Sequence, residues 1–224
     1  MSDARADIFA NIRRSLGVSG QEAPRRAATQ ERLERAPKGL VPQRGQVSGA
    51  DRIALFRKQA EGVQATVADV DSISDAPAAV AQYLRDHNLP AAIRMGADLR
   101  LKMMPWSDTA LDVKQGVSDG HDLNGVSHAF SGVAETGTLV MTSGPDNPTT
   151  LNFLPDNHIV IVNAKDIAGD MEEVWSKVRF AHGKGEMPRT VNFITGPSRS
   201  ADIGQQLLLG AHGPRNLHII IVKA

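Results

Sequence analysis

The stretch that decides the fold is "HIVIVNAKDIAGDMEEVWSKVRF", residues 158–180. It opens with a continuous run of β-branched residues, which is typical of a parallel strand buried on both faces. From residue 167 onward, its apolar residues recur at the spacing of an amphipathic helix. The strand-like segment "TVNFIT" follows at 190–195. Together these segments predict a strand–helix–strand unit with a right-handed crossover.

Helices and strands alternate before this unit as well, which favours a parallel sheet covered by helices. Residues 129–143 depart from the alternation, because two strand-like runs flank a turn at Thr136 and Gly137 and predict a hairpin. The predicted fold class is therefore α/β, with a Rossmann-like, mostly parallel sheet, flanking helices and an antiparallel hairpin insert. Outside the hairpin, we expect helices at 51–63 and 74–89 and strands at 63–70, 90–96, 109–113 and 217–222.

The start of the chain differs in composition from the rest. Apolar residues at helical spacing, with Gly17 as a C-terminal stop, predict a short helix that ends near Leu16. Its apolar stripe must dock on another surface, because so short a helix is marginal in isolation. Residues 17–50 are rich in polar residues and proline and predict a linker with at most one helical turn. We therefore expect an N-terminal arm over 1–50 and an α/β domain over 51–224.

The composition argues against several function classes. Lys and Arg together number 25, and so do Asp and Glu, so the chain lacks the basic excess that nucleic acids and anionic membranes attract. There is no cysteine, which excludes disulfides, thiolate-ligated iron–sulfur clusters and a thiol nucleophile. We find no apolar run long enough for a membrane span and no secretory signal pattern, so we expect a cytoplasmic location.

Two loops rich in glycine, serine and threonine lie beside the most strand-like segments, at 132–148 and 193–204. Ligands bind at the carboxyl ends of strands in open α/β sheets, and the second loop directly follows a predicted strand. Arg199 in that loop carries a planar guanidinium suited to a carboxylate or a phosphate. The alternative is that both loops are ordinary turns. The candidate ligand-binding residues are Thr136, Gly137, Thr138, Ser143 and Gly144 in the first loop and Gly196, Ser198, Arg199 and Asp202 in the second.

Glu135 is the only acidic residue between Asp122 and Asp146, and predicted strands flank it. A carboxylate there could act as a catalytic base, as a nucleophile or as the partner of a cation such as Arg199. It could also be a hairpin-turn glutamate exposed to water. The hydroxyls and accessible amides around it favour a site, because such groups hold anions.

Histidine and asparagine residues offer further polar groups. Two glycines bracket His212, so its loop could hold the imidazole against a ligand or Asp202, or form only a turn before the last strand. Asn152 and His158 could also point into a site, although a histidine at a strand start is more often satisfied within the core.

One local cluster has the composition of a site for a hard metal ion, namely Asp119, His121 and Asp122. Acidic surface turns have the same composition. None of the histidines has the spacing of a known zinc motif. We therefore expect no metal site.

Three segments carry a resemblance to a known family. They are "AETGTLVMTSGPDNPTTLNFLPDNHIVIV" at 134–162, "NFITGPSRSADI" at 192–203 and "GAHGPRNLHIIIV" at 210–222. In this order they resemble the lactate utilization protein C (LutC/YkgG) family, whose domain is called the LUD domain. The short helix at the start of the chain is similar as well, whereas the linker at 17–50 matches only loosely.

The resemblance implies a fold like that of the NagB/RpiA/CoA-transferase group. It also implies a role in the bacterial oxidation of L-lactate to pyruvate, together with two partner proteins that carry iron–sulfur clusters. The missing cysteines agree with this division, since redox centres would sit on the partners and this chain would carry no cofactor. The pocket that carries over by motif comprises Glu135, Thr136, Gly137, Thr138, Ser143, Gly144, Gly196, Ser198, Arg199, Asp202 and His212.

Three functional hypotheses follow. The first is a non-redox subunit of the lactate utilization system, as a monomer or homo-oligomer, that binds a small anionic or nucleotide-like ligand between the two loops. The second is a free-standing enzyme of the CoA-transferase or sugar-phosphate isomerase kind that uses Glu135. The third is an assembly scaffold whose N-terminal helix docks a partner.

Overall fold

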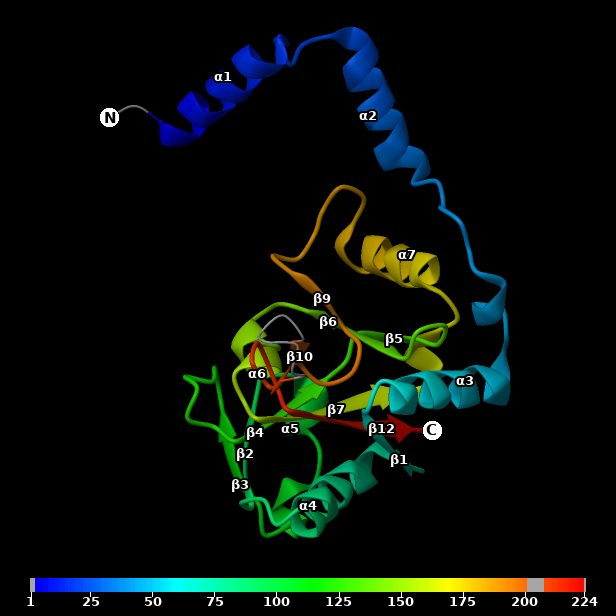
Figure 1. Ribbon diagram of the computed structural model, residues 1–224, viewed down its shortest axis with the longest axis vertical. Helices are drawn as coiled ribbons and strands as arrows, with labels where there is room; N and C mark the ends of the chain where they lie inside the picture. The colour runs from blue at the N-terminus through cyan, green and yellow to red at the C-terminus, as the bar shows by residue number, and fades with distance from the viewer. Residues whose placement is uncertain (1–2, 201–207, 224) are drawn as a thin grey trace.

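The computed structural model describes residues 3–200 and 208–223 (Figure 1). Its helices are α1 (Ala4–Leu16), α2 (Ala23–Arg35), α3 (Gly49–Gly62), α4 (Ala76–Asp86), α5 (Leu99–Lys102), α6 (Thr149–Phe153) and α7 (Met171–His182). Its strands are β1 (Thr66–Val70), β2 (Ala92–Met95), β3 (Asp112–Gln115), β4 (Asn124–His128), β5 (Ser131–Val133), β6 (Thr138–Thr142), β7 (Asn157–Asn163), β8 (Ile167–Ala168), β9 (Val191–Ile194), β10 (Arg199–Ser200), β11 (Leu208–Leu209) and β12 (Asn216–Val222). Short 3₁₀ turns lie at η1 (Gln43–Gly45), η2 (Ile73–Asp75), η3 (Trp106–Asp108) and η4 (Ala164–Asp166).

A six-stranded sheet forms the centre of the domain, in the order β1-β12-β7-β4-β2-β3, and every neighbouring pair is parallel. The two most apolar strands lie side by side in its middle, with Ile219 of β12 opposite Val160 of β7. Both strands are buried except at one end residue each. The predicted fold class and the prediction of strands buried on both faces are confirmed.

Alternate residues of the central strands pack on opposite faces of this sheet. Ile159 and Ile161 of β7 pack with helices α4 and α5. Val160 and Val162 of the same strand pack with α3 and the hairpin strand β6. α7 packs against the hairpin strands in a separate cluster. The domain is therefore layered, and Figure 1 shows α4 and α7 at its opposite ends.

The predicted antiparallel hairpin is confirmed as β5 and β6. With β8 and β9 it forms a second sheet in the order β8-β5-β6-β9. The hairpin turn contains Gly137, whose φ is +66°. A Cβ atom at this position would lie 2.2 Å from the backbone nitrogen of Ala60. Only glycine therefore allows the hairpin turn to pack against the backbone of α3.

The predicted strand–helix–strand unit is wrong in its last strand. β7 forms as expected, and the helix forms as α7 but begins only at Met171, since Ile167 and Ala168 belong to strand β8. β9, however, joins the second sheet and runs antiparallel to β6. β12 instead lies beside β7 in the parallel sheet. The residues of β9 are only partly buried, whereas those of β12 are almost all buried. The shorter, partly buried strand β9 thus enters the second sheet, whereas the longer, almost fully buried strand β12 enters the central sheet.

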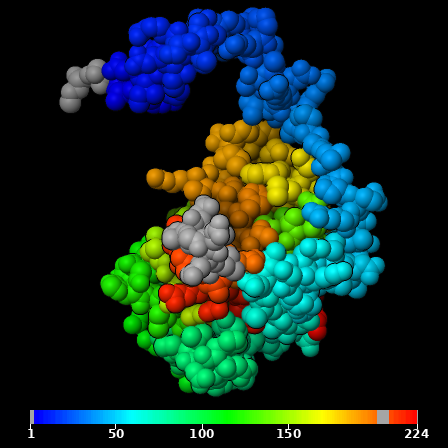
Figure 2. Space-filling view, viewed as in Figure 1, coloured from blue at the N-terminus to red at the C-terminus, as the bar shows by residue number. Residues whose placement is uncertain are grey.

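The N-terminal arm contains two helices, which Figure 2 shows arching away from the body of the protein. α1 begins after Asp3, whose carboxylate accepts a hydrogen bond from the Arg5 amide, and ends at Gly17 with φ +62°. Its predicted boundaries are confirmed. Its apolar stripe, however, is exposed, with the side chain of Leu16 65% accessible. Within the described residues, the expected docking of this stripe on another surface is not observed.

The prediction of at most one helical turn within residues 17–50 is wrong, because α2 spans 13 residues. Apolar periodicity does not reveal this helix, since none of its residues is buried. It starts with Pro24 in its first turn and is otherwise rich in Ala, Arg, Gln and Glu, which are strong helix formers. An ion pair one turn apart, between Glu31 and Arg35 at 2.8 Å, adds a small stabilisation. Among the described residues, no helix is long and apolar enough to cross a membrane.

Candidate functional site

A cavity of about 250 Å³ opens at the junction of the two sheets. Its walls come from the starts of β7 and β12, from α6 and from the loop that follows β9. Phe153, Phe193 and Leu217 give it an apolar lining. Polar side chains share this lining with the apolar ones, a combination that small-molecule sites commonly have.

His158 contributes a buried imidazole to the cavity wall. The side chain is 1% exposed, and its Nε2 lies 3.1 Å from the Ser127 hydroxyl oxygen. Its Nδ1 is buried and has no hydrogen-bond partner in the described structure. Burial lowers the pKa of His158 to about 3. The ring is therefore neutral near pH 7.

Asn152 contributes a second unsatisfied group to the same wall. The Ser127 hydroxyl donates to the Asn152 Oδ1 at 3.4 Å, whereas the Asn152 Nδ2 is buried and has no hydrogen-bond partner among the residues that the structure describes. Because the Ser127 proton is directed to Asn152, the proton on the neutral imidazole of His158 belongs on Nε2. The cavity thus holds an unused acceptor, Nδ1 of His158, and an unused donor, Nδ2 of Asn152. Buried groups of this kind call for a ligand or water.

Six of the residues considered for a site from the sequence line this cavity, namely Asn152, His158, Gly196, Ser198, Arg199 and His212. Ser198 joins the loop after β9 to the loop before β12. Its amide donates to the Pro214 carbonyl at 2.8 Å, and its Oγ accepts from the His212 amide at 3.3 Å. The short pair β10–β11 holds the same loops together, with Arg199 opposite Leu209.

Gly196 and Arg199 both contact the end of α3. Gly196 has φ +75°, and a Cβ there would lie 2.4 Å from the Val63 carbonyl oxygen. The Arg199 guanidinium donates to that same oxygen at 2.9 Å, and its side chain is exposed. It therefore reaches the mouth of the cavity rather than its floor. Asp202 lies outside the described residues.

The first glycine-rich loop reaches the cavity only indirectly. The hydroxyls of Thr136, Thr138 and Thr195 form a chain with oxygen–oxygen distances of 2.7 Å and 2.7 Å. Thr195 lines the cavity, whereas Thr136 and Thr138 do not. Gly137 serves the contact with α3 described above. The two loops therefore meet through hydroxyl groups, but only the second loop forms the cavity wall.

Three other residues predicted for the site lie elsewhere. Ser143 binds Thr190, with its amide donating at 3.0 Å and its hydroxyl accepting at 2.9 Å. Gly144 closes a turn with Asn147. Glu135 is 5% exposed and lines a separate cavity at the start of α7. The expected pairing of Glu135 with Arg199 does not form, and the exposed hairpin-turn alternative for Glu135 does not hold either.

The position of the cavity also differs from expectation. Ligands were expected at the carboxyl ends of the parallel strands. The cavity instead lies at the amino ends of β7 and β12. β9 does contribute its carboxyl end, but it belongs to the second sheet. The position differs because β12, and not β9 as predicted, lies beside β7 in the parallel sheet.

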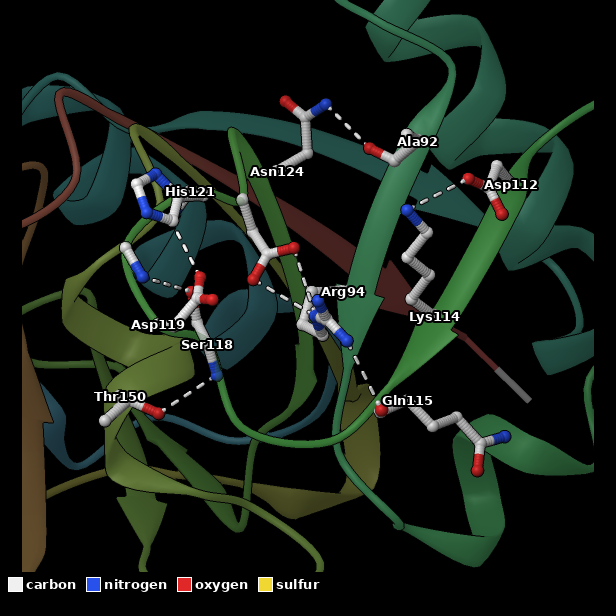
Figure 3. A network of polar contacts seen from close by, with 12 residues as sticks. Ala92, Arg94, Asp112, Lys114, Gln115, Ser118, Asp119, His121, Asn124 and Thr150 are labelled. Atoms are coloured by element: carbon white, nitrogen blue, oxygen red, sulfur yellow. Dashed lines mark hydrogen bonds and ion pairs between the residues drawn. The ribbon is translucent and has the colours of Figure 1, made fainter.

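The cluster considered for a metal ion, Asp119, His121 and Asp122, lies beside Arg94, which binds one of its carboxylates. Figure 3 shows the region around Arg94. Both carboxylate oxygens of Asp122 accept from the Arg94 Nε at 3.0 Å. The Asp119 carboxylate accepts from the backbone amide of His121 at 3.1 Å. Within the described ranges, no three His, Asp or Glu side chains are arranged to hold a metal ion.

Ser127 does not line the cavity but contacts His158, and sequence analysis did not identify it. It lies in β4 between buried residues, and nothing in its local sequence separates it from an ordinary strand serine. Its proximity to His158 follows from the parallel pairing of β4 with β7. The apolar wall was likewise not predicted, because Phe153 and Leu217 come from segments far apart in the chain.

Comparison with known proteins identifies the domain. Residues 123–222 match the model of the LUD domain. Lactate utilization protein C of Oceanobacillus iheyensis is 31% identical over 123 residues, which cover 54% of this chain and 52% of that protein. Lactate utilization protein C of Geobacillus thermodenitrificans is 37% identical over 127 residues, or 53% of this chain and 52% of that protein. The matches thus span about half the length of these relatives.

A solved structure supports the fold. The crystal structure of a DUF162 family protein from Deinococcus radiodurans superposes with a TM-score of 0.60 at 22% sequence identity, and the alignment covers 79% of this chain and 99% of that one. At this identity the likeness concerns the fold alone. The match of residues 123–222 to the LUD domain model, together with the similarity to these relatives, confirms the resemblance that the sequence motifs carry.

Proposed function

We propose that this chain is a non-redox, ligand-binding component of a lactate utilization system. The observation that carries the proposal is the pair of unpartnered buried atoms in the cavity, Nδ1 of His158 and Nδ2 of Asn152. The names of the relatives connect the domain with lactate utilization. Because the chain has no cysteine, iron–sulfur clusters of such a system would be held by partner proteins.

The two unpartnered atoms define the ligand chemistry. The ligand must donate one hydrogen bond to the imidazole of His158 and accept one from the amide of Asn152. A small molecule with a hydroxyl group next to a carboxylate meets both requirements. Arg199 at the mouth adds a positive charge that favours an anion. A volume of about 250 Å³ suits a small acid and is tight for a nucleotide.

The enzyme alternative finds less support. Ser127 and His158 are within hydrogen-bond distance, as in a nucleophile–base pair. Ser127, however, does not line the cavity, and a base whose pKa is about 3 accepts a proton poorly near neutral pH. Glu135, the expected nucleophile of a CoA-transferase-like mechanism, lies in another cavity. These observations favour binding over turnover.

A thermal-shift titration tests the proposal. L-lactate at about 100 times its Kd should raise the melting temperature of the wild-type protein by roughly 5–10 °C, through mass action on the native state. Propionate, which lacks the hydroxyl, should give a much smaller shift. Asn152→Leu keeps the branching of the side chain but removes the donor, and it should abolish the L-lactate response.

The arginine at the mouth offers a matched pair of variants. Arg199→Ala should weaken L-lactate binding several-fold, because the variant loses a positive charge near the carboxylate. Arg215→Ala, which removes another exposed arginine that does not line the cavity, should leave binding unchanged. Equal stabilisation of wild type and Asn152→Leu by L-lactate would show that this cavity is not the ligand site.

A further inference from the structure

We propose that the chain has a second binding site, for a small organic ammonium ion, at the start of α7. A cavity of about 220 Å³ lies there, between the helix and residues 39–46 of the N-terminal arm, which we call the strap. Leu40 and Pro42 of the strap line one side, and Glu135, Glu172 and Trp175 are among the residues on the others. The site shares no lining residue with the His158 cavity.

The carboxylate of Glu135 is the central observation. Its side chain lines the cavity and is 95% buried, since only 5% of it is exposed. Oε1 accepts a hydrogen bond from the Met171 amide at 3.2 Å. Oε2 is buried and has no hydrogen-bond partner in the described part of the chain. A buried carboxylate oxygen without a donor is costly, so a donor from outside the chain is expected.

The charge around Glu135 indicates a cationic donor. Asp170 and Glu172 also line the cavity, and no lysine or arginine does. The carboxylate of Asp170 is already occupied by the Gln46 side chain and the Glu173 amide, both at 2.9 Å. The amino end of α7 offsets about half a unit of negative charge. Three carboxylates therefore leave the cavity with a net attraction for a cation.

The rest of the lining indicates an organic cation. The described residues hold no group of three side chains arranged for a metal ion. Trp175 presents an aromatic ring, and such rings attract ammonium groups through their π-electrons. Leu40 and Pro42 provide apolar contact for a short alkyl chain. An alkylammonium ion would place its charge at the Oε2 of Glu135 and its carbon atoms against the strap.

The strap is held firmly enough to preform this site. The Gly39 amide donates to the Glu172 carboxylate at 2.9 Å, and the Gln46 side chain donates to Asp170. Gly45 between them is buried, and a Cβ there would lie 2.5 Å from the Gly169 carbonyl oxygen. The strap thus packs against the backbone that precedes α7. The ligand would contact both the arm and the domain.

Calorimetric titration with n-propylammonium chloride tests this inference, with 1-propanol as the neutral analogue. For so small a ligand, a Kd on the order of 1 mM is expected. Glu135→Gln keeps the shape and an acceptor for the Met171 amide but removes the charge, and it should weaken binding at least tenfold. Glu186→Gln removes an exposed acid outside the cavity and should have no effect. 1-Propanol should not bind.

The indole signal of Trp175 in an NMR spectrum provides the site-specific readout. It should shift with n-propylammonium. The signal of Trp106, which is buried in the core cluster that contains α4 and α5, should not shift. If Glu135→Gln fails to fold, Trp175→Leu should weaken binding at least threefold instead. No binding to the wild type, or equal loss in Glu135→Gln and Glu186→Gln, would overturn the inference. The L-lactate response of a folded Glu135→Gln protein should persist, which separates this test from that of the proposed function.

Discussion

At the scale of single residues, the site depends on a histidine that stays neutral because it is buried. His158 has its pKa lowered to about 3 by desolvation, well below the value near 6.5 of an exposed imidazole. The folded state therefore binds the imidazole proton more weakly than the unfolded state does. Stability contributed by this residue is present above the unfolded pKa and is lost as the pH falls toward the folded pKa.

This linkage makes a quantitative prediction. Between pH 7 and pH 5, His158 should lower the free energy of unfolding by about 2 kcal/mol, because the unfolded chain takes up a proton that the folded chain does not. Urea denaturation of wild type and His158→Leu at the two pH values measures this, and the pH-dependent loss should be smaller by about that amount in the variant.

Two other histidines provide the controls for that measurement. His218 is also buried with its pKa lowered to about 4. The stability of His158→Leu therefore still depends on pH, and the informative quantity is the difference in pH dependence between wild type and His158→Leu. His182→Leu, at an exposed position at the end of α7, should reproduce the wild-type pH dependence. An unchanged pH dependence in His158→Leu would show that the imidazole titrates normally in the folded protein.

At the scale of elements, the contact between the hairpin turn and α3 determines how the second sheet sits on the first. Gly137→Ala would place a methyl group 2.2 Å from the Ala60 nitrogen at a residue with φ +66°. The combined clash and backbone strain should lower the free energy of unfolding by about 3 kcal/mol or more. Gly120→Ala, also at positive φ but in open space, should cost only about 1–2 kcal/mol. Chemical denaturation of both variants measures the difference, and equal losses would contradict this account of the contact.

The elements also show which parts of the fold can be predicted from sequence patterns. α3 and α4 were predictable because their apolar residues repeat at the helical period, and β7 and β12 were predictable because each is a continuous apolar run. α2 was not, because its stability comes from helix-forming residues rather than from a buried face. The pairing of β9 was not predictable either, since a short apolar strand carries no local record of its partner.

The candidate site shows the same division. The loop carrying Gly196, Ser198 and Arg199 was proposed because it follows a predicted strand and offers an arginine among glycine and serine residues, and it does line the cavity. Glu135 shares a turn with Thr138, yet its carboxylate binds the start of α7 whereas the threonine hydroxyl binds Thr195. Sequence proximity within a turn does not decide which side each residue faces, so the two could not be separated in advance.

At the scale of the whole molecule, the second sheet brings the loop after β9 against the amino ends of the central parallel strands. That junction creates the cavity in which, among the described residues, Nδ1 of His158 and Nδ2 of Asn152 have no partner. The strap of the N-terminal arm lies at the start of α7 and forms one side of the second cavity. The exposed helices α1 and α2 lie beyond it (Figure 2). The two proposals together assign the molecule two sites with opposite preferences, one for an anion and one for a cation.

The most direct test of the central claim is ¹⁵N NMR of the His158 imidazole during titration with L-lactate. The account predicts that Nε2 carries the proton at pH 7 and that the Nδ1 resonance moves upfield on binding, as expected when a lone pair accepts a hydrogen bond. Propionate should leave it in place. A Nδ1 resonance that does not move at saturating L-lactate, or a proton found on Nδ1 in the free protein, would contradict the proposed mode of binding.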